Sequence, residues 1–384
     1  MKVLMVSKSQ VLGAYHGKLR ELAKLGVDLT VIVPPRWGNQ AIEMRDSTDY
    51  KIRVVPCAFS GSNHFYFYRS GIGPLDADLV HLEEEPWSLV TYQFVRTCVK
   101  EHKPFIFFTW QNIYKSYPPP FNYFERFSFK HARVGIAGTE EARELLRTRS
   151  FSGPIAVIPQ LGIDPNFFFR HDVSDLKTEL GLAGRFVVGY IGRIVPEKGI
   201  ADLIRSLALL PERCVLLLVG DGQFRRTAEQ LAEELGVASR IRWIPQISSM
   251  QVPDYMNVLD VLVLPSRTTR RWKEQFGRVL IEAMACETPV VGSSSAEIPA
   301  VIGQAGLVFP EGDVAALTAH VRSLYDRPDL AACLGAKGRA RVLEKFTHRR
   351  IAEETVKVYR QVIGGFTAGE PEAVVPSVPV VAAP

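Results

Sequence analysis

Short apolar runs alternate with amphipathic stretches along most of the chain. The runs have the length of buried strands and cover residues 3–7, 27–33, 52–56, 79–82, 105–109, 134–138, 155–158, 186–191, 214–219, 241–244, 261–264, 290–292 and 307–309. Helical patterns lie between them, for example at residues 17–24, 89–100, 199–210 and 223–235. This alternation is typical of α/β folds. It predicts two Rossmann-like, doubly wound domains with parallel sheets that face a cleft.

A break in the pattern divides the chain. Residues 158–170 combine proline, glycine, an Asp-Pro pair and several aromatic residues, which is the composition of a linker. We therefore predict domains at residues 1–160 and 161–345. Residues 346–364 have the pattern of an amphipathic helix. Residues 365–384 are rich in Pro, Ala and Val without periodicity, which predicts a disordered tail.

The composition is that of an ordinary globular protein. Of the 384 residues, 47% are hydrophobic and 23% are charged, and no apolar run approaches the roughly 20 residues that a membrane-spanning helix needs. The first ten residues have the pattern of a strand and not of a secretory signal. The cysteines are widely spaced in apolar surroundings, which predicts reduced core residues in a cytoplasmic chain; they are Cys57, Cys98, Cys214, Cys286 and Cys333.

The charge is unevenly distributed. The net charge of +5 belongs entirely to residues 1–170, and the rest of the chain is neutral. Such an excess could bring the first domain to anionic lipid head groups or to an acidic acceptor. A modestly basic solvated surface accounts for it equally well. We expect no nucleic-acid partner.

The stretch from Asp260 to Gly303 carries the strongest chemical signal. Its pattern is a strand, a basic loop, a helix that begins near Gly277, and a second strand, so the helix N-terminus faces the carboxyl ends of the strands. Helix-terminal N–H groups can hold phosphates. Glu274 and Glu282 lie on either side, and their carboxylates can accept hydrogen bonds from vicinal hydroxyls. A nucleotide-sugar has this combination of groups.

A second candidate site follows the strand at residues 186–191. The sequence GYIGRIVPEKGI places Arg193 and Lys198 around a turn that contains Pro196. Two cations in one loop could neutralise a diphosphate leaving group without a metal. Taken alone, such a pair is more often a solvated surface feature. Its place after a strand, together with the acidic motif downstream, favours the functional interpretation.

The sequence EQFGRVLIEAMACETPVVGSSSAEIPAVIG resembles the E-x7-E donor motif of retaining glycosyltransferases of family 4, which have the GT-B fold. The resemblance implies that Arg193, Lys198 and Glu274 are catalytic and that Glu282 holds the ribose, with neither metal nor cofactor. G-R-x4-K-G and V-G-x-G of the family match Gly192 to Gly199 and Val219 to Gly222. The donor contacts implied in this way are Gly13, Gly192, Gly220, Gly222, Pro245, Ile247, Phe276, Gly277, Arg278, Val279, Leu280 and Glu282.

The first domain is expected to bind the acceptor. Its first loop contains Gly13 and His16 but no G-x-G-x-x-G, which disfavours a nicotinamide dehydrogenase. After the strand at 79–82, Glu84 or Glu85 could orient an acceptor hydroxyl or take its proton, although a cap for the next helix is an equal alternative. Gln111 stands where many members of the family have a histidine, and an amide cannot take up a proton at neutral pH.

Three further segments have weaker signals. The aromatic run at residues 64–69 favours a packed strand over a membrane-contacting or glycan-stacking surface. Asp76 and Asp78 form a D-x-D sequence but precede a strand, so we interpret them as turn residues. Residues 268–273 place three cations and a tryptophan before Glu274, either as a cover for donor phosphates, as a contact for an anionic acceptor or as a mobile basic loop.

The sequence therefore predicts a retaining glycosyltransferase that uses a UDP- or GDP-sugar and an acceptor hydroxyl on a glycan, a lipid-linked sugar or a small molecule. Polysaccharide or glycolipid assembly at the inner face of a membrane is compatible with the basic first domain. Two other classes stay open. One is a nucleotide-sugar epimerase or hydrolase of the same fold, and the other is a non-catalytic sugar-binding module.

Overall fold

The computed structural model describes residues 1–43, 49–69 and 72–365. The described residues form two compact units, one of residues 1–162 together with residues 348–365, and one of residues 163–347. Apart from Gly365, the tail predicted at 365–384 lies outside the described residues.

The first unit is built on a seven-stranded sheet in which all neighbouring strands are parallel. Its strand order is β11-β10-β9-β8-β1-β2-β5. The strands are β1 Lys2–Val6, β2 Asp28–Val33, β5 Lys51–Val54, β8 Leu79–Leu82, β9 Phe105–Thr109, β10 Val134–Ala137 and β11 Ile155–Val157. Two small antiparallel pairs are β3 Arg36–Trp37 with β4 Gln40–Ala41, and β6 Cys57–Ala58 with β7 Phe67–Tyr68.

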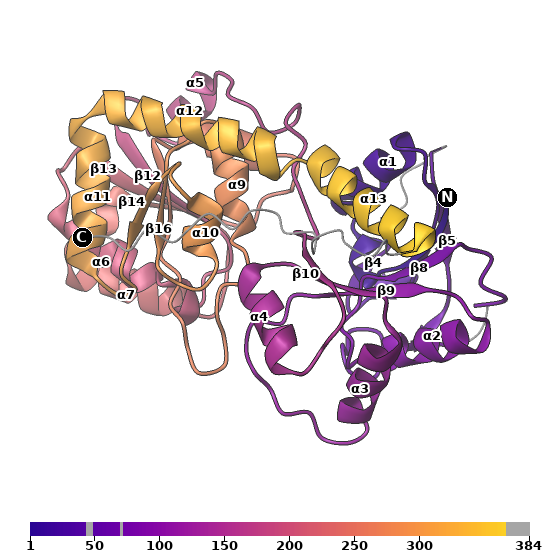
Figure 1. Cartoon of the computed structure of the whole chain (residues 1–384). Coiled ribbons are helices and arrows are strands. Elements are labelled where there is room, and N and C mark those ends of the chain that lie inside the picture. The colour runs from indigo at the N-terminus through magenta and orange to yellow at the C-terminus, as the bar shows by residue number, and fades with distance from the viewer. Residues whose placement is uncertain (44–48, 70–71, 366–384) are drawn as a thin grey trace. The chain divides into compact units, whose positions relative to one another are not determined.

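Helices cover both faces of this sheet, as Figure 1 shows. They are η1 Lys8–Val11, η2 Gly13–Tyr15, α1 Gly17–Lys24, α2 Leu89–Lys100, α3 Phe121–His131, α4 Glu140–Thr148 and α13 His348–Gly364. Successive residues of β1 point to opposite faces, so Val3 and Met5 join one buried cluster while Leu4 and Val6 join another. Both faces of the central strands are therefore buried, which is why a strand such as β9 is a continuous apolar run.

The last helix, α13, completes the first of these clusters together with α1. Ile351, Val356 and Tyr359 of α13 are buried beside the strands. The Tyr359 hydroxyl lies 2.7 Å from His81 Nδ1 on β8. Burial lowers the pKa of His81 to about 3, although nearby Glu83 opposes that shift, so this histidine is neutral at pH 7. The helix is thus fixed to the sheet by packing and by a buried polar contact.

A buried ion pair joins α1 to the end of β8. Lys18 Nζ lies 2.6 Å from Glu83 Oε1, and the two side chains are 2% and 0% exposed. Gln10 donates a further hydrogen bond to the Glu83 carboxylate at 3.3 Å. Burial alone would raise the pKa of Glu83, but the Lys18 ammonium and His81 lower it to about 2. Glu83 is therefore a charged group in the core that depends on its partners.

The second unit has a six-stranded parallel sheet in the order β14-β13-β12-β15-β16-β17. The strands are β12 Phe186–Ile191, β13 Cys214–Val219, β14 Ile241–Ile244, β15 Val261–Leu264, β16 Val290–Ser293 and β17 Leu307–Phe309. The helices are α5 Ser174–Glu179, η3 Pro196–Lys198, α6 Ile200–Leu209, α7 Arg225–Glu234, η4 Ala238–Arg240, α8 Val252–Val258, α9 Arg278–Ala285, α10 Ile298–Ile302, α11 Val314–Asp326 and α12 Pro328–Lys345.

These sheets confirm the predicted class of two Rossmann-like domains. In each sheet the strand order reverses direction once, between β1 and β8 in the first unit and between β12 and β15 in the second. Ligands of open α/β sheets bind outside the carboxyl ends of the strands at such switch points. The loops after β1, β8, β12 and β15 are therefore the places at which to look for a site.

The cysteines are free thiols, and three are core residues as predicted. Cys98, Cys214 and Cys286 are buried, and burial raises the pKa of Cys98 and of Cys286 to about 12. Cys57 and Cys333 differ from the prediction, because the first is only half-buried and the second is exposed on α12.

Candidate functional site

The two halves of the predicted donor site meet at the switch point of the second unit. Lys198, at the end of η3, follows β12, whereas Glu274 lies in the loop after the neighbouring strand β15. Lys198 Nζ is 2.5 Å from Glu274 Oε2, and the Ser266 hydroxyl donates to the same oxygen at 2.8 Å. The side chains of Lys198 and Glu274 are 14% and 10% exposed. A partly buried cation and carboxylate, 76 positions apart, therefore share one site.

Helix α9 begins beside this pair. Gly277 caps it with φ 75°, and a Cβ at this position would lie 2.9 Å from Leu264 Cδ2, so a side chain here would be strained. The predicted set of phosphate-binding N–H groups needs one correction. The Leu280 N–H donates to the Gly277 carbonyl at 2.8 Å within the first turn, and the Leu280 side chain is buried.

The other predicted donor residues around α9 differ in how deeply their side chains are buried. The Phe276 side chain is buried, and its ring meets that of Phe346 edge-on at 5.7 Å, so only its backbone can face a ligand. Arg278 and Val279 are half-buried at the start of the helix. Glu282 lies one turn further on and pairs with Arg278 Nε at 2.9 Å. Burial raises the pKa of Glu282, and the Arg278 cation opposes this.

The glycines after β12 and β13 pack two loops against each other. A Cβ on Gly220 would lie 2.1 Å from the Gly192 carbonyl oxygen, and one on Gly222 would lie 2.2 Å from that of Ile194. Hydrogen bonds from Ile194 N–H to Asp221 and from Phe224 N–H to Ile194 join the same loops. The absence of side chains at these positions is thus needed for the close backbone approach, independently of any nucleotide.

Three predicted donor residues lie on exposed or half-exposed loops at this edge. Arg193 is exposed directly after β12, where its carbonyl accepts the Tyr190 hydroxyl at 2.7 Å. Pro245 is exposed and Ile247 half-exposed after β14. Their side chains are therefore accessible from the carboxyl edge of the sheet.

The basic loop before Glu274 is held by long-range bonds. Arg267 Nε donates to Asp202 Oδ2 at 2.6 Å, and Thr268 Oγ1 donates to Glu311 Oε1 at 2.6 Å. The face of Trp272 lies 4.9 Å from Lys198 Nζ. The sequence identifies neither Ser266 nor Trp272 as a partner of the Lys198–Glu274 pair. It shows only that a hydroxyl and an aromatic residue lie within eight positions of Glu274.

In the first unit, a carboxylate, a threonine and an amide gather at the carboxyl ends of β8 and β9. Glu85 accepts hydrogen bonds from Thr109 Oγ1 at 2.6 Å and from the Trp110 N–H at 3.0 Å. The Gln111 N–H donates to Thr109 Oγ1 at 3.0 Å. Burial raises the pKa of Glu85, although these two donors oppose the shift. Glu85 and Gln111 are both half-exposed and adjoin one threonine.

The remaining predicted acceptor-side residues belong to the interior. His16 is fully buried, with Nε2 2.8 Å from the Gln10 carbonyl and Nδ1 3.1 Å from the Tyr50 hydroxyl. Glu84 is 2% exposed and is paired with Lys8. The Gly13 N–H, predicted to face the donor, donates to Glu43 at 3.0 Å. These are corrections, because each polar group is already used inside the first unit.

The D-x-D sequence and the aromatic run both have structural roles in the first unit. Asp76 pairs with Lys2 at 2.6 Å, and Asp78 accepts the Lys2 N–H at 2.8 Å, so both are turn residues that cap the start of the sheet, as predicted. In the aromatic run, Tyr66 and Tyr68 are buried while Phe65 is 52% exposed. Packing therefore accounts for most of that run, as predicted.

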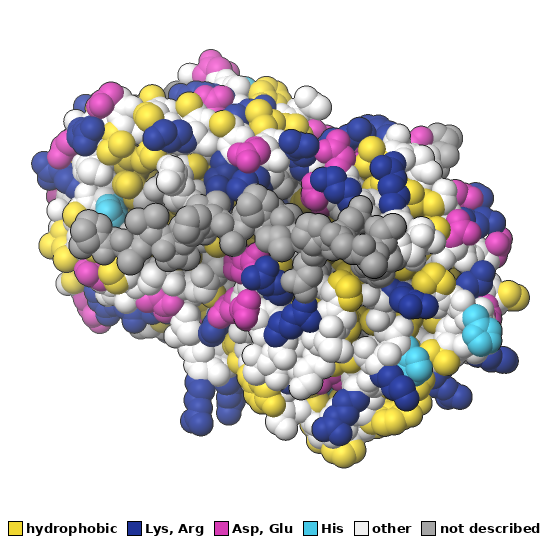
Figure 2. Space-filling view, in the orientation of Figure 1, with side chains coloured by type: hydrophobic (Ala, Val, Ile, Leu, Met, Phe, Trp, Pro, Cys, Tyr) yellow, Lys and Arg dark blue, Asp and Glu magenta, His cyan; other side chains and the backbone are white. Residues whose placement is uncertain are grey.

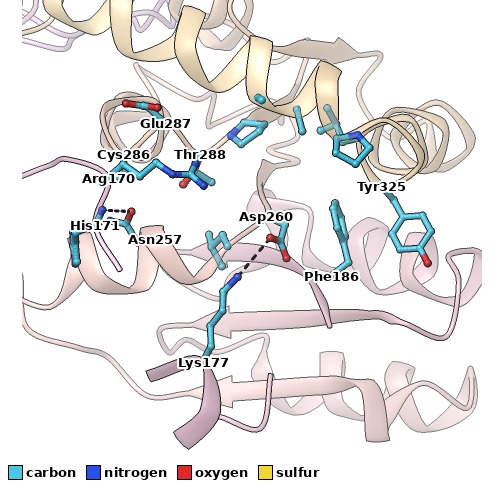
Figure 3. A pocket seen from close by; sticks show the side chains of 16 residues that line it. Arg170, His171, Lys177, Phe186, Asn257, Asp260, Cys286, Glu287, Thr288 and Tyr325 are labelled. Carbon is cyan, nitrogen blue, oxygen red and sulfur yellow. Dashed lines mark hydrogen bonds and ion pairs between the residues drawn. The ribbon is translucent and has the colours of Figure 1, made fainter. Parts of the chain in front are cut away.

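A cavity of about 380 Å³ lies at the opposite edge of the second sheet. Its lining includes Phe186, Asp260 and Pro289, each at the amino-terminal end of a strand. Figure 3 shows Lys177 pointing to Asp260 across it, at 3.5 Å. None of the predicted donor residues lines this cavity. The cavity and the Lys198–Glu274 pair are therefore separate features of the second unit.

The described residues contain neither a grouping that could hold a metal ion nor a helix that could span a membrane. Within residues 1–43, 49–69 and 72–365, no three His, Cys, Asp or Glu side chains are grouped so that they could hold a metal ion. In the same part of the chain, no helix has both the length and the apolar character needed to cross a bilayer.

Solved structures with the same arrangement are known. Sucrose-phosphate synthase from Thermosynechococcus elongatus matches with a TM-score of 0.74 and 22% identity, over 95% of this chain and 99% of that one. HepE from Anabaena, in complex with UDP, matches with a TM-score of 0.74 and 20% identity, over 94% and 100%. The chain therefore has the GT-B fold.

Sequence comparison identifies the second unit more closely. Residues 173–341 match the family described as glycosyl transferases group 1. A phosphatidylinositol monomannoside mannosyltransferase from Mycolicibacterium smegmatis, described as GDP-mannose-dependent, is 33% identical over 222 residues, which are 54% of this chain and 58% of that protein. An alpha-maltose-1-phosphate synthase from the same organism is 30% identical over 62% of this chain and 65% of that protein.

The chain spans 58% and 65% of the length of these two relatives and 52% of the length of a D-inositol 3-phosphate glycosyltransferase from Mycobacterium marinum. Residues 173–341 form a glycosyl transferases group 1 domain in a protein of the GT-B fold.

Proposed function

We propose that this chain transfers a sugar from a UDP- or GDP-sugar to an acceptor hydroxyl, with retention at the anomeric carbon. The contact of Lys198 with Glu274 at the switch point of the second sheet is the observation that carries the proposal. This contact supports the proposal because a cation suits a diphosphate, a carboxylate suits sugar hydroxyls, and the two lie in one loop cluster beside the N-terminus of α9. The relatives, which include glycosyltransferases with different acceptors, support the reaction class.

The proposed chemistry takes place on one face of the sugar. The bond from the anomeric carbon to the diphosphate oxygen breaks, and its electron pair stays with the diphosphate. The acceptor oxygen forms the new bond from the same face, and its proton passes to the departing diphosphate. Lys198 and Arg193 stabilise the charge that develops on the leaving group. Glu274 holds the hydroxyls of the sugar, and Glu282 holds those of the ribose. Glu85 and Gln111 orient the acceptor.

Thermal stabilisation by nucleotides tests the donor site. A ligand at 100 times its dissociation constant adds about 2.7 kcal/mol to the free energy of unfolding, so a matching UDP- or GDP-sugar should raise the melting temperature by several degrees. We expect Glu282→Ala to abolish this shift, because it removes the proposed ribose acceptor. Glu233→Ala, at an exposed position of α7, is the matched control. An undiminished shift in Glu282→Ala would remove Glu282 from the site.

Product analysis separates the proposed reaction from its alternatives. An epimerase or hydrolase would convert the donor without an added acceptor, and a non-catalytic module would return the donor unchanged. A transferase requires the acceptor and forms a new glycoside. The anomeric configuration of that glycoside, read by nuclear magnetic resonance, tests retention directly.

A surface on α3 supports the additional proposal of a peripheral contact with anionic membranes. Tyr123, Arg126 and Lys130 are exposed on one side of the helix, with Tyr123 at 54%. The single acidic residue of α3, Glu125, is buried and pairs with Arg149 Nε at 2.8 Å. Figure 2 shows Lys and Arg side chains beside hydrophobic ones over this part of the first unit. Aromatic rings next to unopposed cations suit the interface of an anionic bilayer.

Vesicle binding tests this contact. The full chain should bind vesicles that contain phosphatidylglycerol more tightly than vesicles of phosphatidylcholine alone. Each basic side chain near an anionic surface contributes about 1 kcal/mol, so Arg126→Glu with Lys130→Glu should weaken binding by at least tenfold. Arg226→Glu with Lys337→Glu, at exposed positions of the second unit, is the charge-matched control. Equal losses in both double variants would show that net charge alone attracts the protein and that α3 is not the contact.

A further inference from the structure

The ammonium group of Lys198 has two partners from the loop that precedes α9. Its Nζ lies 2.5 Å from Glu274 Oε2 and 4.9 Å from the centre of the Trp272 ring. An ammonium group has three N–H donors. One is directed to Glu274, and the ring face attracts the cation from another side through its quadrupole. Together the two partners restrict a side chain that otherwise has four rotatable bonds.

The position of Trp272 is set by its own turn. The Thr269 N–H donates to the Trp272 carbonyl at 2.8 Å, and the Trp272 N–H donates to Thr269 Oγ1 at 3.0 Å. Arg267 and Thr268 fix the start of this turn to Asp202 and Glu311. The ring is half-buried, whereas Arg270 and Arg271 at the tip of the turn are exposed. Trp272 is therefore held against Lys198 by bonds that do not involve Lys198.

We propose that Trp272 is a positioning residue, which acts through Lys198 on the departing diphosphate. This inference rests on the proposed function, in which Lys198 stabilises the leaving group. With Glu274 and Trp272 in place, the remaining N–H of Lys198 is directed at a phosphate oxygen before the reaction begins. Without the ring, water would occupy the place beside the ammonium, and the preorganisation of the Lys198 charge would be lost.

A double-mutant cycle on the full chain tests the proposal. We expect Trp272→Ala to lower kcat by about tenfold and to change KM for the donor by less than about twofold, because the contact strengthens only as the diphosphate charge develops. Trp272→Phe keeps an aromatic face and should retain most of the activity. In the Lys198→Met background, Trp272→Ala should cause no further loss.

Three results would overturn the proposal. They are equal losses from Trp272→Ala in both backgrounds, a loss in Trp272→Phe as large as in Trp272→Ala, and an effect confined to KM. Titration of the proteins with UDP and with GDP gives a readout without turnover. Trp272→Ala should weaken binding of the matching diphosphate by about tenfold in the wild-type background and leave it unchanged in the Lys198→Met background.

The titration also separates this inference from the proposed function. If the wild-type protein forms no glycoside with any donor and acceptor but binds UDP or GDP in the predicted Lys198-dependent way, the transferase proposal fails and the role of Trp272 stands. If glycoside forms and the cycle is additive, the role of Trp272 fails and the transferase proposal stands. If the wild-type protein binds neither nucleotide, both fail.

Discussion

Replacing Lys198 with methionine should lower the turnover of the matching nucleotide-sugar by about a hundredfold to a thousandfold, the usual cost of removing one preorganised group that stabilises developing charge. Methionine preserves much of the length and apolar volume of the side chain but removes the ammonium that lies 2.5 Å from Glu274. The leaving diphosphate would then lose one of the two cations, Lys198 and Arg193, that we propose stabilise it. Release of UDP or GDP with the donor found by thermal stabilisation measures the effect.

Lys337→Met is the control for this substitution. Lys337 is exposed on α12 of the same unit, so the change removes an equal charge away from the switch point and should leave turnover unaltered. A Lys198→Met protein with turnover within about threefold of the wild-type value would exclude Lys198 from leaving-group stabilisation, since such a loss is below the range for one group of this kind.

The second large effect concerns stability. Lys18→Met should lower the free energy of unfolding by about 3–5 kcal/mol at pH 7, because it leaves the Glu83 carboxylate buried without its partner. Lys18 and Glu83 are 2% and 0% exposed and 2.6 Å apart. The pKa of Glu83 is lowered from 4.5 to about 2, so the pair makes its full contribution to stability above about pH 4.5 and loses that contribution as the pH falls from there toward 2. Urea unfolding followed by circular dichroism measures the loss.

An exposed pair in the same helix provides the comparison. Lys24 Nζ lies 2.7 Å from Glu21, but the Lys24 side chain is 57% exposed, so Lys24→Met should cost at most about 1 kcal/mol. Adding Glu83→Gln to Lys18→Met removes the unpaired charge and should recover part of the stability. If Lys18→Met were no more destabilising than Lys24→Met, the buried pair would contribute nothing beyond a surface pair.

The regular elements could be predicted from the sequence because both sheets are buried on both faces. The strands at residues 79–82, 105–109 and 186–191 coincide with their apolar runs, since each residue of such a strand needs an apolar environment. The two-residue strands β3, β4 and β6 are not predicted, whereas β7 lies within the aromatic run at residues 64–69, for which the sequence favours a packed strand. β3, β4 and β6 have no hydrophobic period, and pairing with a neighbouring segment defines them.

The donor loops could also be located from the sequence, since Lys198 and Glu274 follow strands that adjoin in the sheet. The direction in which a polar side chain points at the end of a strand could not be predicted. Glu83, Glu84 and Glu85 are consecutive, yet the first pairs with Lys18, the second with Lys8 and the third with Thr109. Each of these three partners lies 24 to 76 positions away in the sequence. Local pattern contains no information on such partners.

The contribution of α13 to the first core has a consequence for the order in which the protein is made. A ribosome releases residues 1–162 long before it reaches Ile351 and Tyr359, which together with α1 cover one face of the first sheet. During synthesis of the whole intervening unit, α1 is present on that apolar face, but the surface that packs against α13 stays uncovered. The unit that emerges first is thus the one that can finish folding only last, and nascent chains stopped before α13 would expose a surface that attracts chaperones or other unfinished chains.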